Sequence, residues 1–386
     1  MRETFIPFFI KKYFDYILTL FISGILFWVV NFFGLGYTFD SRMYVEIANE
    51  VNSVGFFQIQ GFNVKPPVLP FLIAVLGESN MVWLNFLCFI VIQAFGVYWS
   101  HQIKHAYLRY TFLTIVIFAT PHLLISSFLW TEPLFLTILL LTFFLLEKHH
   151  KTQLTSYVFS AIVLLITLPF VRFAGIFLVV PIFGFLLIRS KRKKIVLLSI
   201  VILFFISFGW VFLFSEGFLG RWDRFITPLI SGRINHIGYN LTSYSKAITS
   251  WFFPYMIDGL FSRSVSVVIL FIVIYKSSLL YFQNHRSKIY LTPLLFIIYC
   301  VLMISVFRVE YYAAERYLAI FYLLLFLNLF LQIDDLIKST QSIIVKRVTY
   351  FGIALLGSYS VLRAIRNVFF WNGLRTDSFD LSSILI

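Results

Sequence analysis

Asp40 is the first acidic residue that is placed to do chemistry, because it lies in a polar stretch between two apolar regions of the chain. This stretch, residues 37–70, reads YTFDSRMYVEIANEVNSVGFFQIQGFNVKPPVLP. An ionised aspartate accepts a proton from an attacking hydroxyl group that lies within hydrogen-bonding distance. Aspartate is also a preferred helix N-cap, and the helix dipole stabilises its charge. The sequence therefore leaves two compatible roles for Asp40, general base and helix cap.

Glu132 and Arg172 lie at the ends of later apolar segments. In Thr131-Glu132-Pro133 the acid fits the first turn of a helix that Thr131 caps, with the proline at an early helical position. Arg172 fits an interfacial arginine whose charged end reaches the membrane surface. Both charges also fit the wall of a polar cavity, because ionisable groups at a bilayer are costly and mark functional sites.

A cluster of charges and tyrosines precedes a late apolar segment, with the sequence RVEYYAAERY over residues 308–317. Arg308 and Arg316 fit boundary charges that pair with Glu310 and Glu315. Arginines beside tyrosines also suit the phosphate of a lipid-linked ligand, because a guanidinium group binds phosphate as a fork.

Two short elements are expected to hold Asp40. The apolar residues that follow it recur at helical spacing, and the polar residues fall on the opposite side. The apolar set is Tyr44, Ile47, Ala48 and Val51, and the polar set is Arg42, Glu46, Asn49 and Glu50. A second apolar piece opens with Lys65-Pro66-Pro67 and ends before Gly77, which makes it too short to span a bilayer. The sequence predicts two interfacial helices in this first outer loop, residues 36–80.

The composition of the chain is that of a polytopic membrane protein. Of its 386 residues, 60% are hydrophobic, 49 are phenylalanine and only 12% are charged. These values exclude a water-soluble globular protein. Cys88 and Cys300 both lie in apolar runs, which excludes a disulfide framework or a cysteine-based metal site. We predict an all-α fold in a single membrane-embedded domain, residues 1–386.

Apolar runs predict about eleven transmembrane helices. They cover residues 13–35, 81–101, 110–130, 133–146, 154–171, 173–188, 195–214, 264–282, 289–307, 318–333 and 348–370. The first run is too long for a signal peptide and lacks a small-residue cleavage site, so we interpret it as an uncleaved span. A large outer loop, residues 215–263, follows the seventh run.

The distribution of basic residues predicts the orientation, because lysine and arginine stay preferentially on the cytoplasmic side. With a cytoplasmic N-terminus, more than half of the 31 basic residues fall in the N-terminal segment and the even-numbered loops. The net charge of +14 is then mostly a topology signal and requires no nucleic-acid partner. Asp40 and the other site candidates lie on the outer face in this orientation.

The order of these features resembles the GT-C superfamily of integral-membrane glycosyltransferases, such as the protein O-mannosyltransferases and the aminoarabinose transferase of lipid A. The shared elements, in chain order, are Phe39-Asp40-Ser41-Arg42-Met43-Tyr44, the prolines Pro66, Pro67 and Pro70, Thr131-Glu132-Pro133-Leu134-Phe135, Arg172-Phe173-Ala174-Gly175 with Pro181, and Glu315-Arg316-Tyr317. The resemblance covers about the first 330 residues. It implies a polyprenyl-phosphate-linked sugar as donor and a glycan, lipid or protein as acceptor.

The resemblance also implies roles for the residues that match. Asp40 would be the catalytic acid, either as general base on the acceptor hydroxyl or as a metal ligand. Arg316, Arg172 and Arg308 would hold the donor phosphate and stabilise the negative charge that grows as the sugar leaves. The same cavity would be lined by Glu132, Tyr44, Glu315 and Tyr317.

The chain departs from the family pattern in three respects. Several members carry a second acid beside the first, whereas Ser41 and Arg42 follow Asp40 here. No paired-acid motif supports a divalent metal, so we expect no cofactor. Many relatives have a histidine just before the paired prolines, where this chain has Lys65. The soluble C-terminal domain of some branches is not expected.

Three other classes of protein fit parts of the pattern. A polysaccharide polymerase or O-antigen ligase would place its chemistry in the 215–263 loop, where Arg221, Arg224 and Arg233 lie. A transporter of lipid-linked sugars would need ionisable residues inside its spans, and most of the spans lack them. A purely structural membrane protein would not require so many outer carboxylates and arginines.

The expected location is the plasma membrane. The compact chain lacks eukaryotic additions, which favours the inner membrane of a bacterium. We expect a multi-pass protein with membrane lipids around it and its active site on the outer face.

Overall fold

A computed structural model of the protein is all-helical over the residues that it describes, as the composition predicts. These are residues 5–55, 65–189, 235–254, 257–284, 292–306 and 311–376, with the short pieces 194, 197–202, 205–206 and 309. The α-helices are α1 (Phe5–Val30), α2 (Phe39–Val54), α3 (Val68–Leu76), α4 (Met81–Ser100), α5 (Ala106–Ile117), α6 (Thr120–Ser126), α7 (Glu132–Thr152), α8 (Thr155–Val171), α9 (Ile176–Arg189), α12 (Asn235–Phe252), α13 (Leu260–Asn284), α14 (Thr292–Val306), α15 (Tyr311–Ser339) and α16 (Ile343–Thr376).

Seven helical segments in the described part of the chain are long and apolar enough to cross a membrane, which supports a polytopic membrane protein. The predicted count of about eleven is not confirmed. The runs at 154–171, 173–188 and 289–307 correspond to the shorter helices α8, α9 and α14. Most of the run at 195–214 lies outside the described residues.

The predicted run at 110–130 is not one continuous helix. α5 ends at Ile117, and α6 restarts at Thr120 with Pro121 in its first turn. Proline lacks the backbone N–H that a residue in the helix interior donates to a carbonyl group. It fits the first turn of a helix, where this N–H would have no helical partner. The proline therefore divides the segment into two helices.

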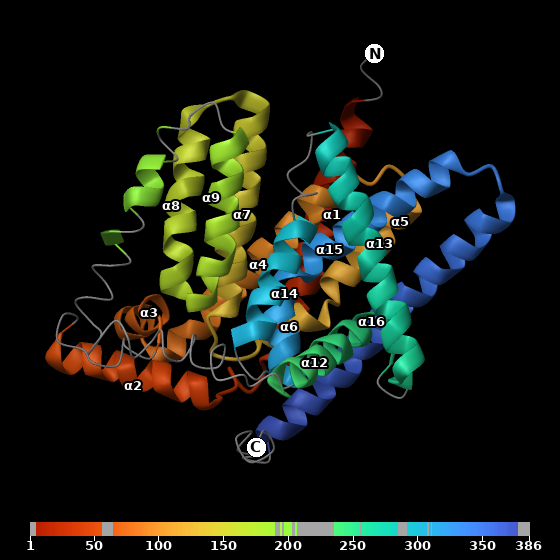
Figure 1. Cartoon of the computed structure of the whole chain (residues 1–386). Helices are drawn as coiled ribbons and strands as arrows, with labels where there is room; N and C mark the ends of the chain where they lie inside the picture. The colour runs from red at the N-terminus through yellow and green to blue at the C-terminus, as the bar shows by residue number, and fades with distance from the viewer. Residues whose placement is uncertain are drawn as a thin grey trace.

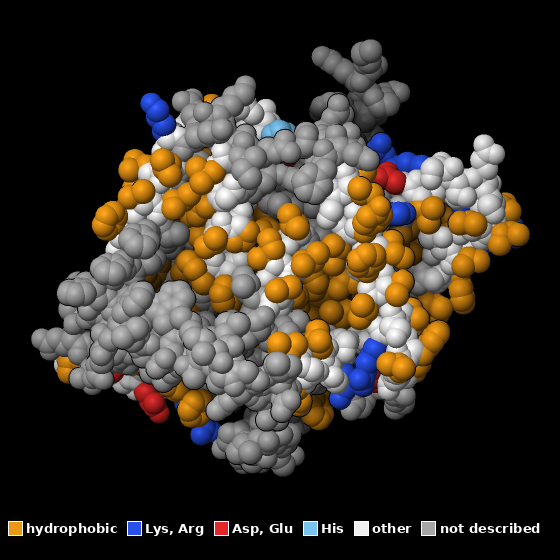
Figure 2. Space-filling model, viewed as in Figure 1, with side chains coloured by type: hydrophobic (Ala, Val, Ile, Leu, Met, Phe, Trp, Pro, Cys, Tyr) orange, Lys and Arg blue, Asp and Glu red, His pale blue; other side chains and the backbone are white. Residues whose placement is uncertain are grey.

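α15 is the central helix of the bundle. In its most apolar window 78% of the residues are buried, and it contacts α5, α6, α7, α12, α13 and α14. α1 and α16 are much more exposed than α15, because only 28% of the residues in the most apolar window of each helix are buried. Figure 2 shows hydrophobic side chains as a broad band across the described surface, with charged side chains mainly at its upper and lower edges.

Two short helices, α2 and α3, are present where the sequence predicts the interfacial pair. Figure 1 shows both at the end of the bundle opposite the N-terminus, with α2 running across the direction of α7, α8 and α9. One buried face joins α2 to α3, formed by Tyr44, Ala48, Leu69 and Ile73 with Leu129. The nine residues of α3 reach about 14 Å at 1.5 Å per residue, which is less than the thickness of a bilayer.

Glycines end both interfacial helices. Gly55 follows α2 with φ +84°, and Gly77 follows α3 with φ +83°. Residues with a side chain rarely adopt a positive φ, so glycine is the residue that allows the chain to turn there. Gly77 confirms the predicted end of the second interfacial segment.

Candidate functional site

Five charged side chains from different parts of the chain meet near the end of the bundle that carries α2 and α3. We call Asp40, Lys65, Glu132, Arg172 and Arg316 the charged cluster. Asp40 lies in α2, Lys65 just before α3, Glu132 at the start of α7, Arg172 just after α8, and Arg316 near the start of α15. The cluster therefore forms only when these four helices and the segment before α3 pack together.

The start of α2 places the carboxylate of Asp40. Thr38 is the N-cap: its Oγ1 accepts a hydrogen bond from the backbone N–H of Ser41, and the hydroxyl of Ser41 accepts one from the backbone N–H of Thr38. This reciprocal arrangement satisfies two backbone donors at the helix start. The interpretation of Asp40 as the helix cap is wrong, because Thr38 has that role. The carboxylate of Asp40 is therefore available for contacts across the cluster.

Trp130 ties the start of α2 to the chain that leads into α7. Its indole Nε1–H donates a hydrogen bond to Thr38 Oγ1 at 2.9 Å. Its ring stacks on Phe128, with 4.6 Å between the ring centroids, and Phe128 forms an isolated parallel bridge with Gly36. These contacts bring Asp40 and Glu132 to the same region.

A tight turn places Arg172 at the C-cap of α8. Arg172 has extended backbone angles, and its carbonyl accepts a hydrogen bond from the N–H of Gly175 at 2.8 Å. A Cβ on Gly175 would lie 2.8 Å from the carbonyl carbon of Leu168, so only glycine fits without a shift of the backbone. The chain reverses within a few residues and the side chain of Arg172 stays inside the protein, 11% exposed.

Glu132 is the centre of the cluster. Its side chain is 0% exposed and forms ion pairs with Arg172 and Arg316. Thr131 donates a further hydrogen bond to its second oxygen at 3.4 Å. A buried carboxylate is stable only when it is paired and hydrogen-bonded, and two arginines meet that requirement. The interpretation of Arg172 as a snorkelling interfacial residue is therefore wrong, since its charge pairs inside the protein.

Asp40 is the exposed member of the two acids, with a side chain that is 30% exposed. Its Oδ2 accepts a hydrogen bond from Arg316 at 2.9 Å, and its Oδ1 pairs with Lys65. Burial raises the pKa of Asp40, but the charges of Arg316 and Lys65 outweigh burial and hold that pKa well below its usual range. Asp40 is ionised at neutral pH, with one cation on each oxygen.

Aromatic rings lie against all three cations of the cluster. The guanidinium of Arg316 lies 4.3 Å from the ring centroid of Trp130, and that of Arg172 lies 4.5 Å from Tyr317. The amino group of Lys65 lies 5.5 Å from the ring of Tyr44. Such contacts attract the cation to the ring face and orient it. They restrict the directions in which the three cations point.

The formal charges of the cluster add up to one net positive charge, from three cations and two carboxylates. An excess cation in a buried site attracts an anionic ligand, and arginine suits phosphate in particular. The cluster therefore combines a preference for an anion with one carboxylate, Asp40, that a second ligand can reach.

The structure brings together Asp40, Glu132, Arg172 and Arg316, with Tyr44 and Tyr317 beside them. Glu315 lies elsewhere: it pairs with Arg363 of α16, which also donates to Ser250 Oγ at 2.9 Å. The expected pairing of Arg316 with Glu315 is wrong, because consecutive residues of one helix project about 100° apart. Arg308 lies outside the described residues.

Lys65 and Trp130 belong to the site, although their sequence patterns did not assign them to it. Lys65 carries a retrospective signal, because a lysine in a loop that is predicted to lie outside departs from the preference of lysine for the cytoplasmic side. Trp130 carries none, since its hydrogen-bond partner Thr38 is distant in the sequence. Among the described residues, no group of three histidine, cysteine or acidic side chains is placed to hold a metal ion.

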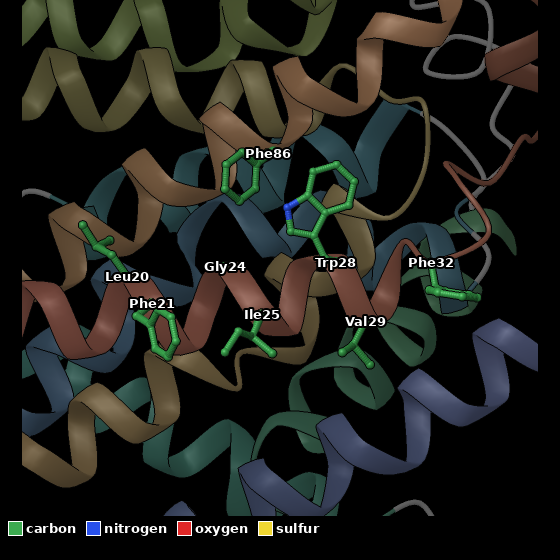
Figure 3. A pocket seen from close by; sticks show the side chains of 8 residues that line it. All are labelled: Leu20, Phe21, Gly24, Ile25, Trp28, Val29, Phe32 and Phe86. Atoms are coloured by element: carbon green, nitrogen blue, oxygen red, sulfur yellow. The ribbon is translucent and has the colours of Figure 1, made fainter.

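A separate pocket lies along α1 and carries no chemistry of its own. Figure 3 shows its lining, which comes from α1, the turn after it and α4. The residues are Leu20, Phe21, Gly24, Ile25, Trp28, Val29, Phe32 and Phe86. All are apolar or lack a side chain, which matches a surface that faces lipid.

Comparisons with known proteins add no family to these observations. No family model matches the sequence, and neither the curated proteins nor the solved structures that were compared with it give a match.

Proposed function

We propose that this protein is a membrane glycosyltransferase that moves a sugar from a polyprenyl-phosphate-linked donor to a hydroxyl group of a lipid, glycan or protein. One observation carries the proposal: the partly exposed Asp40 shares Arg316 with the fully buried Glu132, inside a cluster with one net positive charge. The ordered motifs that resemble the GT-C superfamily support the same function.

The two acids have different proposed roles, which follow from the exposure of each side chain. Glu132 is 0% exposed and holds both arginines, so its role is to fix their positions. Asp40 is 30% exposed, so an acceptor hydroxyl reaches Asp40 and not Glu132. Asp40 is therefore the general base, and Arg316 with Arg172 and Lys65 binds the phosphate of the donor.

The ion pairs of Asp40 suggest how donor binding prepares the base. In the structure Lys65 and Arg316 occupy the two oxygens of Asp40. A donor phosphate competes for these cations and withdraws one of them from the carboxylate. The pKa of Asp40 then rises towards its usual range, because an opposite charge has moved away. Asp40 becomes a stronger base only when the donor is present.

The transfer step requires only these residues, the donor and the acceptor. The acceptor hydroxyl loses its proton to Asp40 while its oxygen attacks the anomeric carbon of the sugar. The bond between that carbon and the phosphate oxygen breaks, and its electron pair leaves with the polyprenyl phosphate. The cations stabilise the negative charge that develops on the leaving phosphate.

The proposed setting is the outer face of a plasma membrane, the inner membrane in a bacterium. A lipid-borne donor lays its isoprenoid chain beside the apolar helices and presents its phosphosugar at the water interface. α2, which carries Asp40, and α3, which follows Lys65, lie together at one end of the bundle (Figure 1). In the proposed setting this end faces the membrane surface, where the phosphosugar of the donor lies.

Mass spectrometry of lipid-linked and surface glycans tests the proposal. Deletion cells are complemented with wild type, with Asp40→Asn or with Glu46→Gln, at equal protein levels in the membrane. Glu46 is the matched control, because it is an exposed acid on the same helix. We expect glycans from cells with Asp40→Asn to lack one sugar residue, as glycans from the deletion cells do. Glycans from cells with Glu46→Gln should contain that residue. Wild-type glycans with Asp40→Asn would rule out Asp40 as the base and favour a polymerase or a transporter.

A further inference from the structure

Three tyrosines from three helices extend the charged cluster beyond its ion pairs. Tyr317 of α15 lies under the guanidinium of Arg172, 4.5 Å away. Tyr244 of α12 and Tyr299 of α14 are buried in the same core cluster, against which Tyr317 packs, and the charge of Arg172 acts on both phenols. The charge of Glu132 also acts on Tyr299. The three phenol groups thus lie on the side of the charged cluster that carries Arg172.

Among the described residues, the hydroxyl groups of Tyr244 and Tyr299 have no hydrogen-bond partner. The two residues are 3% and 0% exposed. A buried tyrosine hydroxyl normally finds a partner, and leaving it without one costs free energy. For packing alone, phenylalanine would serve better at both positions. The two hydroxyls therefore point to a group that is not part of the protein.

Tyr359 shows the contrasting case within the same chain. Its hydroxyl is shared between the carbonyl oxygens of Ser250 and Phe253, at 2.8 and 2.7 Å. This hydroxyl holds α16 against the end of α12, so its role is structural. Tyr244 and Tyr299 have no such partner in the part of the chain that the structure describes, although they are more deeply buried.

We propose that the hydroxyls of Tyr244 and Tyr299 form the subsite for the hydroxyl groups of the transferred sugar, next to the phosphate that the charged cluster binds. This inference rests on the proposed glycosyltransferase function. A phenol both donates and accepts hydrogen bonds, as a sugar hydroxyl does, whereas a phosphate only accepts. The neutral phenols thus match the sugar, and the net positive cluster matches the phosphate.

Phenylalanine substitutions test the inference, because Tyr244→Phe and Tyr299→Phe remove only the hydroxyl. The control is Tyr359→Phe, which removes a hydroxyl with structural partners. Three quantities are measured for each full-length variant: the Tm in detergent, the rise in Tm caused by a polyprenyl monophosphate without sugar, and the amount of sugar transferred in complemented deletion cells. Expression is kept low enough for transfer to limit the amount of glycan.

We expect Tyr244→Phe and Tyr299→Phe to keep the Tm and its rise with polyprenyl phosphate. Sugar transfer should fall about three- to tenfold for each hydroxyl, as for the loss of one neutral hydrogen bond. Tyr359→Phe should lower the Tm instead. Unchanged transfer would overturn the inference and assign the hydroxyls to bound water, while the proposed function would stand.

Two other results would also overturn the inference. Loss of the response to polyprenyl phosphate would place the phenols in the phosphate site, and a fall in Tm like that of Tyr359→Phe would make them structural. If polyprenyl phosphate does not stabilise the wild type and deletion cells keep every sugar, the proposed function itself fails. These outcomes separate the failure of the subsite from the failure of the function.

Discussion

Glu132→Gln should be the most destabilising single change in the charged cluster. Glutamine keeps the size of the side chain and removes the charge that pairs with Arg172 and Arg316. Breaking a buried ion pair by removing one partner costs about 3–5 kcal/mol, because the other charge stays buried without compensation. Arg316 keeps its pair with Asp40, so the cost should lie near the lower end, about 3 kcal/mol.

Asp40→Asn is the matched comparison within the same cluster. The side chain of Asp40 is 30% exposed, and Arg316 keeps its ion pair with Glu132 when Asp40 is neutralised. Water screens such a pair, so we expect a cost of about 1 kcal/mol. The two substitutions should therefore differ about threefold in their effect on the free energy of unfolding. In glycan synthesis the order should reverse, because Asp40 is the proposed general base.

The assay is unfolding of the purified protein in mixed micelles of increasing SDS content, followed by tryptophan fluorescence. The double variant Glu132→Gln/Arg172→Gln supplies the internal check. Its loss of unfolding free energy should be smaller than the sum of the losses in the two single variants, because the effects of mutations at the two residues of one ion pair are not additive. The reasoning is refuted if Glu132→Gln costs no more than Asp40→Asn, or if the double variant is additive.

Three further predictions concern the ion pair between α15 and α16, the pKa of Asp40 and the orientation of the chain in the membrane. Exchanging the charges of Glu315 and Arg363 in the double variant Glu315→Arg/Arg363→Glu should recover part of the Tm that each single variant loses; no recovery would mean that their ion pair does not join α15 to α16. The pKa of Asp40 is lowered in the folded protein, so its stabilising effect is complete above the unfolded pKa of about 3.9. The difference in stability between wild type and Asp40→Asn should hold at neutral pH and shrink as the pH falls below about 4; a difference that grows on acidification would contradict the lowered pKa. A membrane-impermeant maleimide added to intact cells should label Glu46→Cys and not Lys151→Cys, and the opposite pattern would reverse the predicted orientation.

The sequence by itself determined the class of the protein and several of its local features. Its apolar runs predicted a helical membrane protein, because a bilayer requires long apolar helices with satisfied backbones. The helical spacing after Asp40 and the prolines before α3 predicted the two interfacial helices, and Gly77 predicted where α3 ends. These features are local, so composition and spacing are sufficient to recognise them.

Only the tertiary structure decided which charges meet. The partners Asp40 and Arg316 are 276 residues apart, and Glu132 and Arg316 are 184 apart. Glu315 and Arg316 are neighbours in the sequence, yet one pairs with α16 and the other with α2 and α7. The direction of a side chain depends on the rotation of its helix within the bundle, and packing against distant segments sets that rotation. The motifs therefore identified four of the five residues of the charged cluster, and packing alone assigned their partners.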